Sequence, residues 1–181
     1  MFVRTQRLLL RPGWPEDAPA LARAIGDEAI VRNLARAPWP YRSFHAEEFL
    51  ALEPVPRMPS LLIFEAGVPD RPVGGCGLGH DDDGAVELGY WIARTAWGRG
   101  YATEAARALI AAARALGHRR LVAGHFVDNP ASGRVLAKLG FASTGAIGMH
   151  FSRGRGADVT YVGFALDLDQ SARGGGTALA A

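Results

Sequence analysis

A glycine-rich turn between residues 98 and 103 is the stretch of the sequence that most clearly indicates chemistry. It reads Gly98-Arg99-Gly100-Tyr101-Ala102-Thr103, and a strongly helix-forming segment begins within it. Glycine lets the backbone approach a ligand closely, and the first N–H groups of a helix have no acceptor within the helix. Such amides bind phosphate groups. Because Arg99 adds positive charge to the turn and Arg94 lies just before it, we predict an anion-binding site.

Two common phosphate-binding motifs do not fit this turn. A P-loop requires a Gly-Lys-Ser/Thr sequence, and the turn contains no lysine. A dinucleotide-binding fingerprint requires a third glycine or an alanine at position 103, where this chain has Thr103. A tight turn that caps a core helix, with no ligand, is the alternative explanation for the two glycines taken alone.

A carboxylate precedes the turn on a predicted strand, residues 86–92. Side chains alternate along a strand, so Glu87 shares one face with Gly89 and Trp91. Glu87 therefore borders the predicted anion site, where a carboxylate could accept a proton. A glutamate that is salt-bridged or exposed at a sheet edge is the structural alternative.

A hydroxyl group lies at the start of a later helix. Asn129 precedes Pro130, which is the pattern of an N-cap followed by proline at the first helical position, and Ser132 lies in the first turn. A serine there also has a plain role in capping. Cys76 and His80 would lie about 13 Å apart along a strand, too far for a nucleophilic pair. The acidic run after His80 is typical of a solvated hairpin tip, so no metal site is predicted.

Hydrophobic spacing and turn residues predict the elements that position these groups. Helices are expected at residues 17–25, 27–34, 43–52, 101–116 and 130–140, the third of them capped by Ser43 with Glu47. Strands are expected at residues 8–10, 61–66, 73–79, 86–92 and 121–127, and two more are joined by the turn 153–156. Antiparallel hairpins followed by one strand–helix–strand crossover make an α/β (α+β) fold, a mixed sheet with helices on both faces.

Composition limits the class of protein. The 181 residues suffice for one domain, expected at 1–168, with a flexible tail at 169–181. A single cysteine, the lack of a long apolar run and an N-terminus unlike a signal peptide predict a cytoplasmic protein. The net charge is +2, but residues 1–92 hold 9 basic and 13 acidic residues (−4) and residues 93–181 hold 11 and 5 (+6). Such asymmetry often marks where an anionic partner binds.

Residues 98–105 resemble the acetyl-CoA pyrophosphate loop of the GNAT-superfamily N-acetyltransferases, in particular the branch related to the ribosomal-protein N-terminal acetyltransferases RimJ and RimL. The resemblance extends from about residue 4 to residue 167. Superfamily members often have Gln or Arg where this chain has Trp97. Three further segments occur in the family's order and spacing: residues 87–92, 129–132 and 138–141.

The resemblance implies a GNAT-like, mostly antiparallel seven-stranded sheet whose two central strands splay apart, with the pantetheine arm of acetyl-CoA in the gap. Main-chain groups of Trp91 and Ile92 would pair with its amides, and the Asn129 side chain would reach it. Basic residues would balance its phosphate charge: Arg94, Arg99, Arg134 and Lys138. The residues expected to contact the cofactor are Trp91, Ile92, Arg94, Gly98, Arg99, Gly100, Tyr101, Ala102, Thr103, Asn129, Arg134 and Lys138.

The implied activity is transfer of an acetyl group from acetyl-CoA to a primary amine, of a protein N-terminus or a small molecule, by direct attack in a ternary complex. The amine must be neutral to attack, and an α-amine, with a pKa of about 7.8, needs less help than a lysine, with a pKa of about 10.4. Glu87 is the expected base, with His125 or a water chain as alternatives, and Ser132 would protonate the leaving thiolate. Trp39 and Tyr41 are expected in the acceptor pocket, or else as core anchors.

A non-catalytic module that binds or senses acyl-CoA is the alternative function. The basic second half lacks the basic run and aromatic pattern of a nucleic-acid-binding protein, so neither a nucleic acid nor a membrane partner is predicted. The acidic first half slightly favours a cationic acceptor. The identity of the acceptor and the oligomeric state, a homodimer included, stay open.

Overall fold

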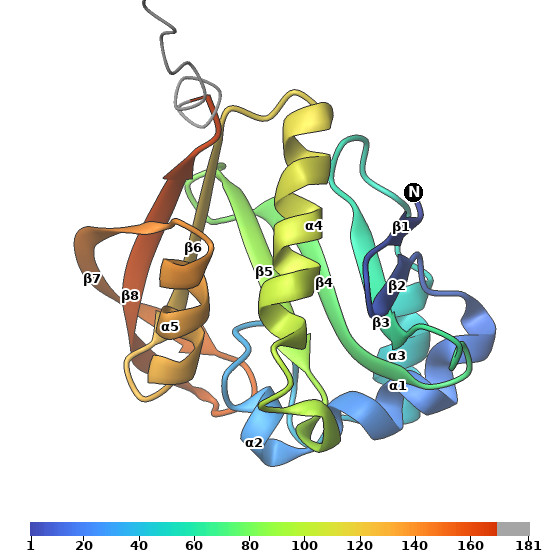
Figure 1. Ribbon diagram of the computed structural model, residues 1–181. Helices are drawn as coiled ribbons and strands as arrows, with labels where there is room; N and C mark the ends of the chain where they lie inside the picture. The colour runs from blue at the N-terminus through green and yellow to red at the C-terminus, as the bar shows by residue number, and fades with distance from the viewer. Residues whose placement is uncertain (170–181) are drawn as a thin grey trace, which may run out of the picture.

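An eight-stranded sheet organises the chain in the computed structural model, which describes residues 1–169 (Figure 1). The strand order is β1-β2-β3-β4-β5-β6-β8-β7, and neighbours are antiparallel except for the parallel pair β5 and β6. The strands are β1 (Val3–Arg4), β2 (Leu8–Arg11), β3 (Ser60–Glu65), β4 (Pro72–His80), β5 (Val86–Ile92), β6 (Arg120–Phe126), β7 (Ala142–Ser152) and β8 (Ala157–Asp167). The predicted mixed sheet is confirmed, with the two-residue strand β1 in addition to the seven strands expected.

Helices cover both faces of the sheet, as predicted. Figure 1 shows α4 and α5 on the face toward the viewer and α1 and α3 behind the sheet. The helices are α1 (Ala18–Ile25), α2 (Glu28–Val31), α3 (Ser43–Leu50), α4 (Tyr101–Ala115) and α5 (Pro130–Lys138), with 3-10 turns η1 (Pro15–Asp17) and η2 (Arg94–Ala96). Among residues 1–169, no helix is long and apolar enough to cross a membrane.

Two hydrophobic cores hold the layers together, one on each face of the sheet. The apolar run of β3 contributes to both, because Leu61 and Ile63 pack under α4 whereas Leu62 and Phe64 pack against α1 and α2. Alternation along a strand that is buried on both faces produces this pattern. α4 is rich in alanine, the best helix former, and its side chains lie close against the sheet.

The parallel strands β5 and β6 pair only near their starts. Within the described residues, their register joins Glu87 to Val122 and no later pair. Figure 1 shows the two strands separating toward the end of the sheet where α4 begins. The prediction of a splayed central pair is therefore confirmed, and the gap opens beside the N-terminus of α4.

The β4–β5 hydrogen bonds fix which main-chain groups face this gap. Ala93 N–H donates to the Val73 carbonyl at one end of the pair, and Asp81 N–H donates to the Ala85 carbonyl at the other. Bonding alternates along antiparallel strands, so the odd-numbered residues of β5 exchange hydrogen bonds with β4. The even-numbered residues, such as Ile92, turn their main-chain groups toward β6.

The predicted cap of α3 is wrong in detail. The helix begins at Ser43, as expected, but its N-cap is Arg42, and the Arg42 N–H donates to His45 Nδ1 rather than to a glutamate. The His45 ring nitrogen, three residues after Arg42, thus accepts the capping hydrogen bond that the sequence pattern assigned to the Glu47 side chain. The expected tail at 169–181 lies, apart from its first residue, outside the described residues.

Candidate active site

The glycine turn, residues 98–103, has the local geometry of an anion-binding site. Gly98 and Gly100 have φ values of 77° and 78°, which L side chains rarely adopt. Hydrogen bonding skips the turn, since the Trp97 amide bonds back to Arg94 and the next amide to find a backbone acceptor is that of Glu104. The N–H groups of residues 98–103 have no protein acceptor in the described part of the chain, and they lie at the N-terminus of α4.

Two contacts hold the turn in place from behind. Arg7 donates to the Arg99 carbonyl over 2.9 Å and pairs with Glu104 at 2.6 Å. Burial raises the pKa of Glu104, but hydrogen bonds from Thr5 and Arg7 outweigh it, so the pKa is lowered overall. Its negative charge, which would oppose an anion at the turn, is thus neutralised by Arg7.

Trp97 has a structural task in the turn. Its indole Nε1–H donates to the Ile92 carbonyl over 2.7 Å, which ties the end of β5 to the segment that enters the turn. Half of the Trp97 side chain is exposed, so the bond serves to position the chain rather than to fill a core. Gln or Arg at this position has no indole ring, so neither could place the same N–H donor against the Ile92 carbonyl.

A cleft of about 1190 Å³ runs from the glycine turn across the sheet gap to the segment between α2 and α3. At the turn it is lined by Gly98, Gly100, Tyr101, Ala102 and Thr103. Arg134 and Lys138 of α5 line the same end, both are exposed, and neither has an ion-pair partner within residues 1–169. That these two side chains balance the charge of phosphate groups stays a prediction.

The other two predicted counter-charges point elsewhere. Arg99 pairs with Glu65 of β3 at 2.8 Å, and Arg94 pairs with Asp27 at 3.4 Å. Neither residue lines the cleft. Proximity in sequence to the turn was therefore a poor guide, because each side chain turns toward a carboxylate on a distant element.

The main chain of β5 corrects a second prediction. Trp91 lies opposite Gly75 of β4 and bonds to that strand, so its N–H and C=O are not free for a ligand in the gap. Ile92 faces the gap, but its carbonyl is taken by Trp97, which leaves its N–H. The Trp91 side chain still lines the cleft, on the face shared with Glu87 and Gly89.

The start of α5 brings a serine and a tyrosine together. Asn129 is the N-cap, as predicted, and its side chain accepts from the Ser132 amide over 3.4 Å. Ser132 Oγ lies 2.8 Å from the hydroxyl of Tyr90, which is also 3.2 Å from the Ser132 carbonyl. Burial raises the pKa of Tyr90 to about 12 although the Ser132 bond opposes it, so the phenol stays protonated near neutral pH.

Glu87 is held by a tyrosine from the far side of the gap. The Tyr161 hydroxyl on β8 donates to Glu87 Oε1 over 3.1 Å. The Tyr161 ring crosses β6 directly over Gly124, where the position of a Cβ atom would overlap the ring. Burial first, and then the Glu87 charge, raise the pKa of Tyr161, so it remains a donor. Glu87 Oε2 is left facing the cleft, with Arg36 at 4.0 Å.

His125, the alternative base, also lines the cleft. Its Nδ1 lies 2.8 Å from the Phe126 carbonyl, which can only accept, so Nδ1 carries a proton. Its Nε2 points at Gly133 of α5, where a Cβ atom would lie 2.6 Å away. The ring is thus packed between β6 and α5.

The predicted acceptor residues separate. Tyr41 lines the cleft together with Phe49 and Leu52 of the α3 region, whereas Trp39 lies outside the lining and is 41% exposed. Cys76 is buried, and burial raises the pKa of its thiol to about 12, which leaves no reactive thiolate.

Comparison with known proteins identifies the family and the fold. A model of the acetyltransferase (GNAT) domain matches residues 7–142. The chain belongs to the GNAT acetyltransferase family. The Bacillus licheniformis protein described as uncharacterized N-acetyltransferase p20 is 31% identical over 113 residues, 59% of this chain and 62% of that protein. The match therefore spans less than two thirds of that relative's length.

Solved GNAT structures share the whole fold. A GNAT-family acetyltransferase from Bacillus anthracis superposes with a TM-score of 0.78 at 20% identity, over 93% of this chain and 99% of that one. RimL, a ribosomal L7/L12 α-N-protein acetyltransferase in complex with coenzyme A, gives 0.77 at 20% identity, over 93% and 99%. The Salmonella typhimurium protein yncA, with its cofactor acetyl-CoA, gives 0.68 at 23% identity, over 96% and 99%.

Residues of this GNAT chain fit acetyl-CoA at one end of the cleft. The unbonded amides of the glycine turn suit a pyrophosphate, Arg134 and Lys138 suit its charge, and the sheet gap leaves the Ile92 N–H for an amide oxygen. Sequence reasoning missed Tyr90 and Tyr161, which hold the two predicted catalytic side chains. Tyr90 lies on the opposite face of β5 from Glu87, and no local pattern in the sequence indicated either tyrosine.

Proposed function

We propose that this protein transfers an acetyl group from acetyl-CoA to a primary amine, with Glu87 as the base and Ser132 as a proton donor. One observation carries the proposal: a single cleft joins the unbonded amides of the glycine turn to a fixed carboxylate and a fixed hydroxyl. When bound, acetyl-CoA would supply the acetyl group as an activated thioester. The solved structures of RimL, in complex with coenzyme A, and of yncA, with acetyl-CoA, support this choice of cofactor, because both proteins share the fold.

Glu87 accepts the proton of the acceptor amine at Oε2. Its other oxygen, Oε1, is occupied by the Tyr161 hydroxyl, so the carboxylate cannot rotate away from the cleft without losing that bond. An α-amine with a pKa of about 7.8 is already partly neutral at pH 7. Glu87 therefore needs only to accept the one proton that the amine nitrogen loses as the new C–N bond forms. A protein N-terminus or a small α-amine therefore suits the site better than a lysine side chain.

Ser132 donates a proton from Oγ at the other side of the gap. When Tyr90 donates its own proton to Ser132 Oγ, the serine hydroxyl proton is free to point into the cleft. The demand on Ser132 is modest, because a thiol with a pKa of about 8.5 leaves readily as an anion. Tyr90 serves to position this group, since its hydroxyl bonds only to Ser132 atoms among the described residues.

Titration with acetyl-CoA, followed by thiol release against a panel of α-amines, tests the function. We expect binding at micromolar concentrations and release of coenzyme A that requires an amine. Binding without amine-dependent release would instead support the acyl-CoA binding or sensing module. Absence of binding at high micromolar acetyl-CoA would contradict both. The cytoplasmic location and the lack of a nucleic acid partner stay predictions.

A further inference from the structure

The end of the cleft away from the glycine turn, which we call the acceptor end, is rimmed by two arginines. It contains Arg36, Tyr41, Glu87, Arg153 and Tyr161. Arg36 lies between α2 and α3, its side chain is 71% exposed, and its Nη2 donates to the His80 carbonyl over 2.7 Å. Arg153 lies in the tight turn between β7 and β8, and no ion pair engages it within residues 1–169.

The two arginines come from segments that are locked together. The Arg153 amide donates to the Ala35 carbonyl over 2.8 Å, one residue before Arg36. Arg155 Nε donates to the Arg32 carbonyl over 2.6 Å. Gly154 fits so closely against Val31 that an added Cβ would lie 2.6 Å from its Cγ1. The hairpin tip is therefore docked, and the backbones that carry Arg36 and Arg153 are held at a fixed spacing.

The acidic residues of the cleft leave this pair with net positive charge. Among residues 1–169, three acidic residues line it: Glu48, Glu87 and Asp128. Asp128 already receives two hydrogen bonds from Arg155, at 2.8 and 2.9 Å, and a third from Arg32 at 3.1 Å. The Arg155 bonds lower the pKa of Asp128, so it is ionised and fully paired. The acidity of the first half of the chain is thus not concentrated in the cleft.

Arg36 and Glu87 form only a loose pair. Their closest atoms, Nη2 and Oε2, are 4.0 Å apart, with no hydrogen bond between them. Exposed pairs of this kind contribute little to stability, so a ligand can separate the two side chains at low cost. A ligand that has an ammonium group next to an anionic group would offer Glu87 a cation and Arg36 an anion at the same time.

We infer that Arg36 and Arg153 form a subsite for a carboxylate carried by the acceptor amine. The inference rests on the proposed function, because it takes the amine to Glu87. The shared chemistry is a primary α-amine with a carboxylate close to it. That carboxylate belongs either to a free amino acid or to an acidic side chain near the N-terminus of a peptide.

Planar guanidinium groups suit this task, because each can give a carboxylate two parallel N–H···O bonds. Two of them, on docked segments, would hold the carboxylate while Glu87 Oε2 receives the amine proton. An acceptor that lacks the carboxylate keeps the amine contact with Glu87, but the guanidinium groups of both arginines then stay hydrated and make no contact with it. The carboxylate is therefore expected to act on the binding of the acceptor more than on the chemical step.

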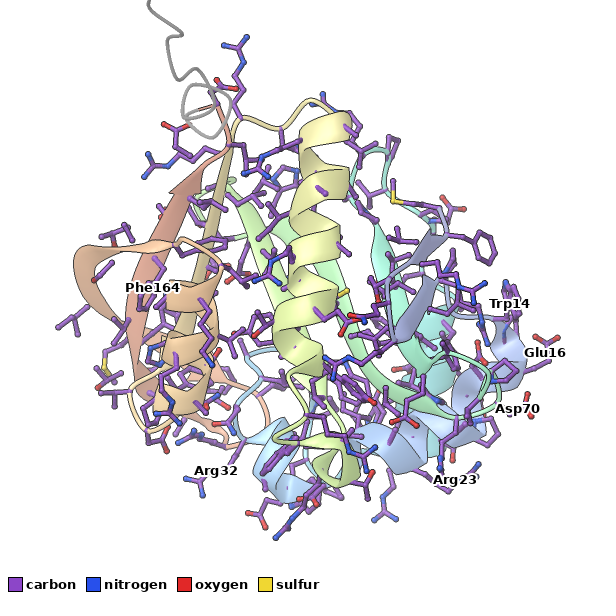
Figure 2. All side chains as sticks on the ribbon, viewed as in Figure 1. Trp14, Glu16, Arg23, Arg32, Asp70 and Phe164 are labelled. Atoms are coloured by element: carbon purple, nitrogen blue, oxygen red, sulfur yellow. The ribbon has the colours of Figure 1, made fainter. Side chains whose placement is uncertain are left out.

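The test compares matched acceptors with and without the carboxylate. The first arm uses leucine against leucinamide, and the second uses C-terminally amidated Ser-Asp-Ala-Leu against Ser-Asn-Ala-Leu. Amine pKa values differ between leucine and leucinamide, so each variant is compared with the parent protein on the same acceptor, which cancels that difference. The variants are Arg36→Gln and Arg153→Gln. Arg23→Gln is the matched control, an exposed arginine on α1 that Figure 2 shows away from the β7–β8 hairpin.

Each cleft variant is expected to raise the acceptor KM roughly 10-fold for the carboxylate-bearing member of at least one arm, as expected when a hydrogen bond to a charged group is lost. The KM for the partner without the carboxylate should change less than about twofold, as should every value for Arg23→Gln. The arm that responds identifies the source of the carboxylate. Equal changes within both arms would overturn the inference and leave acetyl transfer intact.

Product binding gives a readout that does not depend on turnover. Calorimetry with coenzyme A present should show N-acetyl-leucine, or the acetylated Asp peptide, binding roughly 10-fold more tightly than its uncharged partner, with the difference lost in Arg36→Gln. This preference without any acetyl transfer would overturn the proposed reaction but support the subsite. If neither the binding preference nor acetyl transfer is observed, both the subsite and the proposed reaction are overturned.

Discussion

The end of the cleft at the glycine turn presents main-chain groups from one short segment beside the Arg134 and Lys138 side chains, whereas the acceptor end is made of side chains from four separate segments. At the turn, two glycines with positive φ and the first turn of α4 present amides whose direction is set by local backbone geometry. At the acceptor end, Tyr161 crosses β6 to reach Glu87, and Arg153 meets the segment of Arg36 through a docked hairpin. In the proposed function, contacts to the donor thus depend mainly on the backbone of one short segment, whereas acceptor choice depends on packing between distant segments.

Because the two ends of the cleft are built differently, substitutions at one end are expected to leave the other end unchanged. A substitution at the acceptor end changes a side chain without altering the amides at the turn. A substitution at the turn alters the backbone and affects the donor. We therefore expect effects on acceptor and donor parameters to separate cleanly, and the variants below are ordered by the size of effect expected.

Glu87→Gln should have the largest effect on the acceptor side. The amide keeps an oxygen that can accept from Tyr161, so the change removes charge and basicity while retaining the side chain's position. We expect kcat/KM for an α-amine to fall about 100-fold or more, with acetyl-CoA affinity changed little. Steady-state kinetics with both substrates varied measures this.

Glu16→Gln is the matched control for that loss of charge, because Glu16 lies on η1 at one edge of the molecule (Figure 2) and does not line the cleft. Its kinetics should equal those of the parent protein. Full activity of Glu87→Gln across neutral pH would remove Glu87 from the mechanism and leave His125 or water as the base.

Gly98→Ala should act on the donor side. The added methyl meets open space, but the φ of 77° strains any L residue, so the turn is expected to shift and its amides to lose their common direction. We expect the acetyl-CoA Kd to rise about 10-fold, with the acceptor KM little changed. Isothermal titration gives the first quantity and kinetics at saturating acetyl-CoA gives the second.

Gly84→Ala provides the same strain elsewhere. Gly84 has a φ of 80°, also with open space around its missing side chain, but it lies in the β4–β5 hairpin turn outside the cleft. Both variants should lower the free energy of unfolding by about 1–2 kcal/mol. Only Gly98→Ala should weaken acetyl-CoA binding; equal Kd values would show that the turn does not hold the donor.

Ser132→Ala should have the smallest effect of the three. The leaving thiol has a pKa of about 8.5 and departs readily without a donor, so kcat is expected to fall only about two- to tenfold. The Asn129 cap accepts from the main chain of residue 132 and is retained. A loss beyond 100-fold would show that Ser132 has a larger part than proton donation. Tyr90→Phe, which removes the hydroxyl beside Ser132 Oγ, should give a similar or smaller loss.

Sequence patterns predicted the donor end well because its determinants are local. The glycine turn and the Asn129 cap are present as expected, and so is the splayed strand pair that the family resemblance implied. The roles of Arg94 and Arg99 were misplaced because their directions depend on Asp27 and Glu65, which the fold brings near from elsewhere. The main-chain direction of Trp91 needed the β4–β5 register, which alternation alone does not supply.

The acceptor end was largely out of reach of sequence reasoning. Glu87 was predicted from strand parity, but its partner Tyr161 lies 74 positions later, and Gly124 makes room for that ring without any pattern of its own. The Ser43 cap failed for a local reason instead, since His45, three residues after Arg42, offered a competing acceptor. Contacts between distant segments have no signature in the spacing of either one.

The docked β7–β8 hairpin also sets the order in which the protein can become functional. Arg155 reaches the Arg32 carbonyl across 123 positions of the chain, so the acceptor end stays incomplete until the β7–β8 hairpin has left the ribosome. Chains emerge N-terminus first, and the glycine turn is synthesised well before the hairpin. The acceptor end therefore depends on a segment that is synthesised later than the glycine turn, and it cannot form before that segment has emerged and docked against the residues around Arg32.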